Sequence, residues 1–124
     1  MRRLLILMIL LPTLSFADGA NLRWENATEW EDGAPLLEGD LVETVISYQF
    51  FLLGADLNVP RNYIELDRVP ATTENYFHAN IFTGIHCYVV YGISRTGTNA
   101  RISNEACKVI DLREISPHTN LTVS

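Results

Sequence analysis

The sequence predicts an all-β fold, a two-sheet antiparallel β-sandwich. Apolar and polar residues alternate with a period of two in several short segments, and turn residues separate these segments. No segment after the N-terminal region has convincing helical spacing with caps; the nearest, Leu112-Arg113-Glu114-Ile115, stops at Pro117. The length of 124 residues favours a single domain.

Residues 1–17 have the pattern of a signal peptide. Two arginines precede the apolar run Leu4–Leu11, and Ser15-Phe16-Ala17 places small residues at the two positions that a signal peptidase reads. The run is too short to span a bilayer, which takes about 20 residues. We therefore expect cleavage after Ala17, a secreted or periplasmic protein, and no membrane insertion of the mature chain.

The first half of the mature chain contains two predicted strands. In residues 22–25, Leu22 and Trp24 alternate with polar residues. Residues 26–40 are acidic and rich in turn residues, so we expect loops there, with their charges in solvent. Residues 45–53 (VISYQFFLL) are β-branched and aromatic, as in a strand buried on both faces.

Four further strands are expected in the second half, where β-prone segments again alternate with turn residues. They are residues 63–69, 75–81, 85–93 and 101–111. Pro70 ends the first of them and Gly84 follows the second. Residues 94–99 (SRTGTN) are the predicted turn of a hairpin between the last two. The predicted domain spans residues 18–111, and residues 112–124 form a tail.

Three motifs between residues 21 and 110 indicate a more specific type of β-sandwich. The first is Leu22-x-Trp24 followed by Asp32-Gly33-x-Pro35-Leu36, and the second is residues 46–51 with Gly54. The third is Gly84–Val90, then Gly97, then Ser103-Asn104-Glu105-Ala106. In order and spacing they resemble strands B, C and F–G of fibronectin type III domains, particularly those of bacterial and phage exported proteins. The resemblance implies a fibronectin type III or immunoglobulin-like sandwich.

The chain departs from that family in two places. His86 or Cys87, depending on the alignment, stands where an aromatic residue usually pins the corner between strands E and F, and His86 is the better match. The corner bond is then either missing or made by an imidazole. Only residues 18–21 precede strand B, so strand A is missing or truncated. The alignment on His86 turns Tyr88 and Val90 inward. The predicted core residues are Leu22, Trp24, Tyr48, Phe50, Tyr88 and Val90.

The two cysteines of the chain predict one disulfide. Cys87 and Cys107 lie on the two arms of the predicted hairpin, equally far from Gly97. In a symmetric antiparallel hairpin such residues face each other across the strands. Because Tyr88 and Ala106 turn inward, we expect the bridge on the outer face of the sheet.

The charge of the chain limits its partners. Its formal net charge is −6, and removal of Arg2 and Arg3 with the signal peptide makes it −8. Such a protein repels phosphate backbones and anionic lipids, so we expect no nucleic-acid partner. Proteins and glycans remain as partner classes.

No motif for catalysis or metal binding is present. The acidic loop lacks the oxygen spacing of a calcium loop, and the histidines have no HxH, HExxH or Cys-x-x-Cys companions. No GxSxG elbow accompanies the serines. We expect no catalytic site, no metal and no cofactor.

The candidate partner-binding residues lie in loops. Trp30, in the acidic loop, is either a cap on the end of the sandwich or an exposed anchor for a partner or sugar ring. The predicted hairpin turn offers Arg95, Thr96, Gly97, Thr98 and Asn99, although its composition is also ordinary turn chemistry.

Two functions follow from these features, with a small hydrolase as a distant third. The first is an exported, non-catalytic binding or adhesion module that acts through loops and sheet edges. The second is a structural subunit of a phage particle or surface filament, assembled by strand addition. A missing strand A would leave the edge of strand B open, and Thr119-Asn120-Leu121-Thr122-Val123 alternates like a strand. This tail could add to its own domain, cause self-association, or remain disordered.

Overall fold

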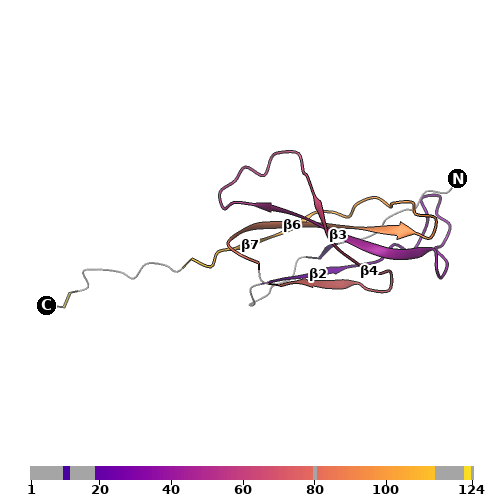
Figure 1. Cartoon of the computed structure of the whole chain (residues 1–124), viewed down its shortest axis with the longest axis horizontal. Coiled ribbons are helices and arrows are strands. Elements are labelled where there is room, and N and C mark those ends of the chain that lie inside the picture. Colours follow the sequence, from indigo (N-terminus) through magenta and orange to yellow (C-terminus); the bar gives the residue numbers. More distant parts are fainter. Residues whose placement is uncertain (1–9, 12–18, 80, 114–121, 124) are drawn as a thin grey trace.

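The computed structural model describes residues 10–11, 19–79, 81–113 and 122–123, which contain seven β-strands and no helix (Figure 1). The strands are β1 (Leu10–Leu11), β2 (Ala20–Trp24), β3 (Leu41–Phe51), β4 (Ile64–Pro70), β5 (Asn75–His78), β6 (Gly84–Ser94) and β7 (Ala106–Ile110). The all-β prediction is confirmed. The described residues include no helix that could cross a membrane.

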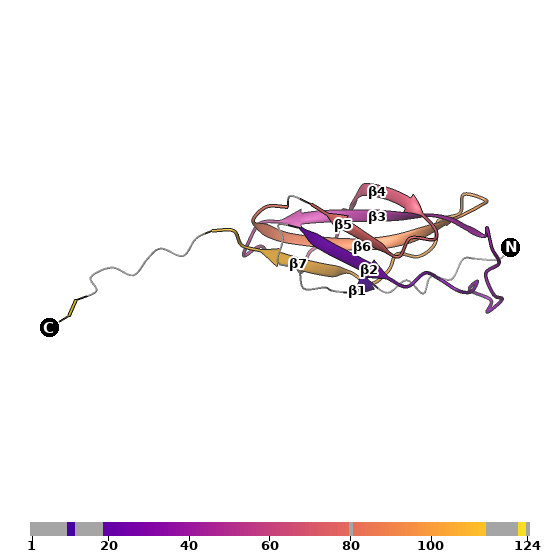
Figure 2. The ribbon, with the colours of Figure 1, turned by 90° about the horizontal axis from the view of Figure 1, so that it is seen from below.

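The strands form two antiparallel sheets that lie one on the other, as Figures 1 and 2 show. One sheet has the order β1-β2-β5, and the other has the order β4-β3-β6-β7. The longest strands, β3 and β6, are neighbours at the centre of the four-stranded sheet, with Ile46 opposite Val90. In β6 nearly every residue is buried, whereas β3 is buried mainly over residues 44–47.

The core lies between the two sheets. Leu22 and Trp24 of β2 pack in one buried cluster with Ile46, Tyr88 and Val90 of the other sheet. Trp24 is 2% exposed, and burial of each such side chain contributes about 1.5–3 kcal/mol. Of the other predicted core residues, Tyr48 is partly buried against this cluster, and Phe50 is half-buried among aromatic rings near one end.

The β6–β7 hairpin is not symmetric, which corrects the sequence-based expectation. β7 is shorter than the predicted strand over residues 101–111. Near the turn Ile93 pairs with Asn99, whereas further along Tyr88 pairs with Ala106, so the second arm holds two more residues than the first. Residues 100–105 absorb this difference. There the ladder is replaced by Ser103, which donates its N–H to the Val90 carbonyl at 2.8 Å and accepts the Val90 N–H on Oγ at 2.9 Å.

The predicted disulfide between Cys87 and Cys107 is present, and the two residues are directly opposite in the β6–β7 register. It lies on the outer face of the sheet, as expected. This outer face is not open to solvent at Cys87, which is fully buried, because residues 53–57 pack over it with Phe51 and Ile85. The segment between β3 and β4 is therefore a cover for the outer face rather than a simple turn.

The edge of β2 carries a strand where the sequence leaves strand A missing. Leu10 and Leu11 of β1 pair antiparallel with Trp24 and Arg23 (Figure 2). Both leucines belong to the predicted signal peptide. The β2 edge thus accepts an extended apolar segment, and in this chain the segment comes from residues expected to be removed on export. Most of the predicted tail lies outside the described residues, although Val123 is described and is 94% exposed.

Candidate functional site

The two loop regions singled out by the sequence lie at the same end of the sandwich, on the right in Figures 1 and 2. We refer to residues 26–40 and 94–101 together as the loop end. Arg95 donates its backbone N–H to the carbonyl oxygen of Asp40 at 3.0 Å. Its guanidinium Nη2 also lies 3.7 Å from Asp40 Oδ1. Asp40 therefore ties the two loops together.

Asp40 is buried, which makes the expectation of solvated charges in residues 26–40 wrong for this residue. Its side chain is 5% exposed, and its Oδ2 accepts the N–H of Leu37 at 2.9 Å. A buried carboxylate is tolerated only when hydrogen bonds and an opposite charge compensate for lost water. Leu37 N–H and Arg95 supply this compensation, so Asp40 is part of the framework of the loop end.

Trp30 sits half-buried in a tight loop of its own. The backbone N–H of Trp30 donates to the Ala34 carbonyl oxygen at 2.7 Å, and the backbone carbonyl oxygen of Trp30 accepts the Gly33 N–H at 2.9 Å. The next residue, Glu31, forms an ion pair with Arg101 Nε at 3.2 Å and thereby makes a second link to the other loop. The indole is thus held by a fixed backbone and keeps part of its surface in solvent.

The turn between β6 and β7 is ordered by its own hydroxyl groups. Ser94 Oγ lies 2.9 Å from Thr96 Oγ1 and accepts the Thr98 N–H at 3.2 Å. Gly97 has φ of 82°, a conformation that glycine adopts without strain. All of residues 95–99 are exposed. A turn that is ordered before binding loses less conformational entropy when a partner binds.

An apolar groove of about 500 Å³ lies beside these loops. Its lining combines residues of the acidic loop with the turn between β4 and β5. Leu36, Leu37 and Leu41 supply apolar surface, and Leu37 is 68% exposed. A contiguous exposed apolar surface marks partner contacts more often than a single exposed leucine does, so the groove adds to the loop end rather than defining a site by itself.

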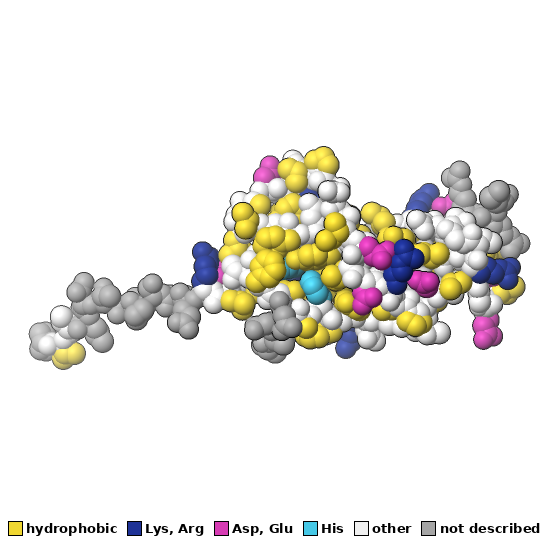
Figure 3. All heavy atoms as spheres, in the orientation of Figure 1, with side chains coloured by type: hydrophobic (Ala, Val, Ile, Leu, Met, Phe, Trp, Pro, Cys, Tyr) yellow, Lys and Arg dark blue, Asp and Glu magenta, His cyan; other side chains and the backbone are white. Residues whose placement is uncertain are grey.

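A second group of polar side chains lies between the sheets, away from the loop end. His86 is fully buried; its Nε2 donates to the Phe82 carbonyl at 2.6 Å, and its Nδ1 lies 2.7 Å from Tyr48 Oη. His78 Nδ1 makes a similar contact with Tyr88 Oη at 2.7 Å. Figure 3 shows hydrophobic side chains gathered around histidine on this part of the surface. Burial lowers the pKa of both histidines.

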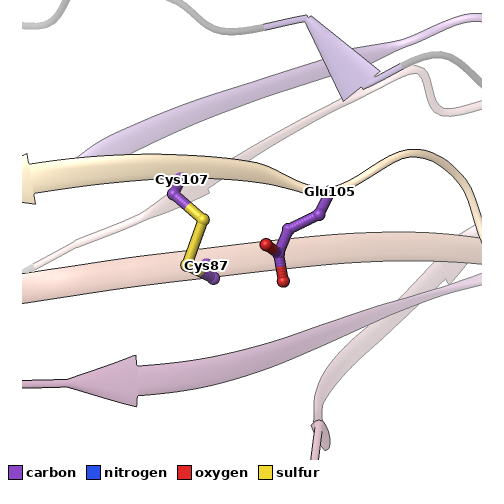
Figure 4. Close-up of side chains that lie close together, drawn as sticks. All are labelled: Cys87, Glu105 and Cys107. Carbon is purple, nitrogen blue, oxygen red and sulfur yellow. A yellow bond between two sulfur atoms is a disulfide. The ribbon is translucent and has the colours of Figure 1, made fainter. Parts of the chain in front are cut away.

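A cluster of potential metal ligands lies on the outer face of β6 and β7. The ligand atoms of Cys87, Cys107 and Glu105 lie within 4.8 Å of one another (Figure 4). Both sulfur atoms are used in the disulfide, so neither is available as a thiolate ligand. The Glu105 carboxylate is also engaged: Arg61 binds both of its oxygens, at 2.7 and 3.0 Å, and Tyr63 donates to it.

The Arg61–Glu105 contact fastens the segment that covers the disulfide. The Arg61 guanidinium donates to the carbonyl oxygens of Leu57 and Val59 and lies 5.0 Å from the centre of the Phe51 ring. Its hydrogen bond lowers the pKa of Glu105. Burial, together with the bond to Glu105, raises the pKa of Tyr63 to about 12. These pKa shifts arise from contacts that hold residues 53–61 against the sheet, and they do not indicate a reactive site.

Comparison with protein-family models and with curated proteins finds no match.

The sequence analysis singled out Trp30 and the 95–99 turn separately. In the structure they lie in two loops that Asp40–Arg95 and Glu31–Arg101 join at one end of the sandwich. Sequence reasoning missed Asp40, Glu31 and Arg101, the residues that join the two loops. The acid-rich composition of residues 26–40 was visible, but it does not reveal which carboxylate meets an arginine far along the chain. The disulfide also fits an oxidising, extracytoplasmic compartment.

Proposed function

We propose that the chain is a fibronectin type III-like domain that acts as an exported, non-catalytic binding or adhesion module. The strand order supports this proposal, because β2, β3, β6 and β7 are arranged as the proposal expects of strands B, C, F and G in two antiparallel sheets. The bond from His86 to the Phe82 carbonyl also supports it, since the proposal gives His86 the corner role of the family's aromatic hydroxyl.

The binding surface in this proposal is the loop end. The observation that carries it is the contact of buried Asp40 with Arg95, which joins two loops from different parts of the chain into one surface. That surface offers a half-buried tryptophan, an ordered polar turn and a neighbouring apolar groove. Aromatic anchors held by a rigid frame dominate many protein and glycan contacts. The partner is therefore a protein or a glycan.

A binding screen tests this proposal. The labelled mature chain is applied to a glycan array and to a panel of purified extracellular proteins, and hits are measured by titration. Trp30→Ala should weaken binding by roughly 30-fold, which corresponds to a hot spot of about 2 kcal/mol. Arg68→Ala is the matched control, because Arg68 is an exposed arginine of β4 outside the loop end. A ligand whose affinity falls with Arg68→Ala and not with Trp30→Ala would contradict the proposal.

A second candidate function is a structural subunit assembled by strand addition. The pairing of β1 with the edge of β2 favours it, because this edge accepts an extended segment. A small hydrolase stays a distant third. Among the described residues, the side-chain partners of His78 and His86 are tyrosines rather than a serine or a carboxylate. A screen of glycan and peptide substrates would expose such an activity.

A further inference from the structure

Removal of the predicted signal peptide would expose one edge of β2. In the structure Leu11 pairs with Arg23, and Leu10 pairs with Trp24. Cleavage after Ala17, as the sequence predicts, takes both leucines away and leaves that edge of β2 uncovered. The opposite edge of β2 remains paired with β5. An uncovered edge presents backbone donors and acceptors that another strand can satisfy.

The backbone groups on this edge can be assigned. Trp24 donates its N–H to the Glu74 carbonyl at 3.1 Å, on the side of β5. Successive residues of a strand point their N–H groups to opposite sides, so the N–H of Arg23 points to the edge that β1 occupies. The β4 edge of the other sheet is better protected. β4 carries Arg68 ion-paired with Glu43 and Glu65, and charged edges resist strand addition.

We propose that the uncovered edge of β2 accepts residues 119–123 of a second copy of this chain, in an antiparallel arrangement. This inference rests on the second candidate function and names its donor. The sequence TNLTV alternates, with Leu121 and Val123 on one face, and Val123 is 94% exposed in the single chain. Seated on β2, these apolar residues would take the place of the apolar β1 segment.

The direction of the strands argues for a second copy rather than for the same chain. Lys108 Nζ donates to the Gly19 carbonyl at 2.7 Å, so β7 ends close to where β2 begins. A tail leaving Ile110 and running back along β2 would be parallel to it. The observed pairing is antiparallel, and an antiparallel strand must arrive from the loop end. A neighbouring molecule supplies that direction without a reversal of the tail.

Such an interface joins the tail of one subunit to a different surface of the next, so it propagates head to tail and forms open chains or rings. Residues 111–118 connect the sandwich to the donated segment. Eight residues span at most about 27 Å when extended, which sets the largest distance between the end of β7 in one subunit and the β2 edge of the next.

Complementary variants of the mature chain test the proposal by light scattering after size-exclusion chromatography. The wild-type chain should form species larger than a monomer, with mass that rises with concentration. Deletion of residues 119–124 removes the donor, and Arg23→Pro removes the edge-facing N–H while sparing the bonds to β5. Each variant alone should be monomeric. Their equimolar mixture should form a 1:1 dimer, because one supplies the tail and the other supplies the edge.

Matched controls separate strand addition from loss of folding. Arg23→Ala keeps the N–H and should assemble like the wild type. Leu121→Arg should abolish assembly, whereas Thr122→Arg, on the opposite face of the same segment, should not. The proposal is overturned by a monomeric wild-type chain, by a mixture that stays monomeric, or by equal effects of the two tail substitutions. The tail-deleted chain keeps the loop end, so ligand binding by that chain tests the first function independently.

Discussion

His86 donates its Nε2 proton to the carbonyl oxygen of Phe82 over 2.6 Å and thereby closes the turn that leads into β6. A carbonyl oxygen only accepts, so Nε2 carries the proton, and Nδ1 of the neutral ring accepts the hydroxyl proton of Tyr48. Lys108 is the residue directly opposite on β7. The site therefore suits a neutral imidazole and disfavours an added positive charge.

The first prediction concerns pH. Burial lowers the pKa of His86 in the folded state, so below about pH 6.5, the ordinary histidine value, the unfolded chain binds more protons than the folded one. The free energy of unfolding should fall as the pH drops from 6.5 towards the lowered pKa, by at most about 1.4 kcal/mol per pH unit for one such group. Urea unfolding at several pH values measures this slope.

The control for the pH prediction is His78, whose pKa burial also lowers. His86→Gln should reduce the dependence between pH 5 and pH 7, in addition to lowering stability, and the combination with His78→Gln should remove the rest of it. Equal slopes in the wild-type and His86→Gln chains would show that the buried imidazole is not the titrating group.

The second prediction concerns the disulfide. Cys87 and Cys107 are 20 residues apart, and closing a loop of that size stabilises a fold by about 3 kcal/mol in the chain-entropy model. Cys87→Ala combined with Cys107→Ala should lower the free energy of unfolding by about that amount in urea titrations. Thiol titration of the unfolded, unreduced wild-type protein should find no free thiol. Two titratable thiols in that experiment would mean that the bridge does not form.

The third prediction concerns the cover over the outer face. Arg61→Lys keeps the charge but loses the planar fork that binds Glu105 and two carbonyl oxygens. We expect a lower free energy of unfolding and faster hydrogen exchange in residues 52–62. Arg68→Lys is the control, because the acids that pair with Arg68 are half-exposed, so this variant should change stability and exchange much less. An unchanged hydrogen-exchange rate in residues 52–62 of the Arg61→Lys chain would show that the Arg61–Glu105 contact does not hold this segment in place.

The fourth prediction compares two glycines with positive φ. At Gly84, an added Cβ would collide with the Phe50 ring and with the Phe51 carbonyl oxygen, and φ is 150°. At Gly54, φ is 80° and nothing lies within 4 Å of an added Cβ. Gly54→Ala should therefore cost only backbone strain, about 1 kcal/mol, and Gly84→Ala should cost clearly more. Thermal unfolding of both variants measures the difference, and equal losses would contradict the close packing of Phe50 on Gly84.

The positions of the strands were predictable because they depend on local pattern. The alternation of Leu22 and Trp24 and the apolar run near Ile46 mark the faces that meet in the core. The disulfide was predictable as well, although the hairpin is asymmetric. The turn and the extra residues near Ser103 shift the register in opposite directions, and these shifts cancel at Cys87 and Cys107.

The contacts that build the loop end and the outer cover were not predictable from pattern. Asp40 and Arg95 are far apart in the chain, as are Arg61 and Glu105, and no local period links them. Residues 54–62 contain turn residues, so their composition predicts a loop but not the face on which it lies. Long-range pairs between single charged residues become visible only when the fold brings them together.

The packing of the β2–β5 layer against the four-stranded sheet, with Trp24 between them, holds the two layers of the fold together. Nuclear Overhauser effects in the mature protein test this directly. We predict cross-strand contacts between Ile46 and Val90, together with contacts from the Trp24 indole to methyl groups of β3 and β6. A spectrum dominated by helical connectivities, or a Trp24 ring without contacts to the other sheet, would contradict the two-layer fold and the proposals built on it.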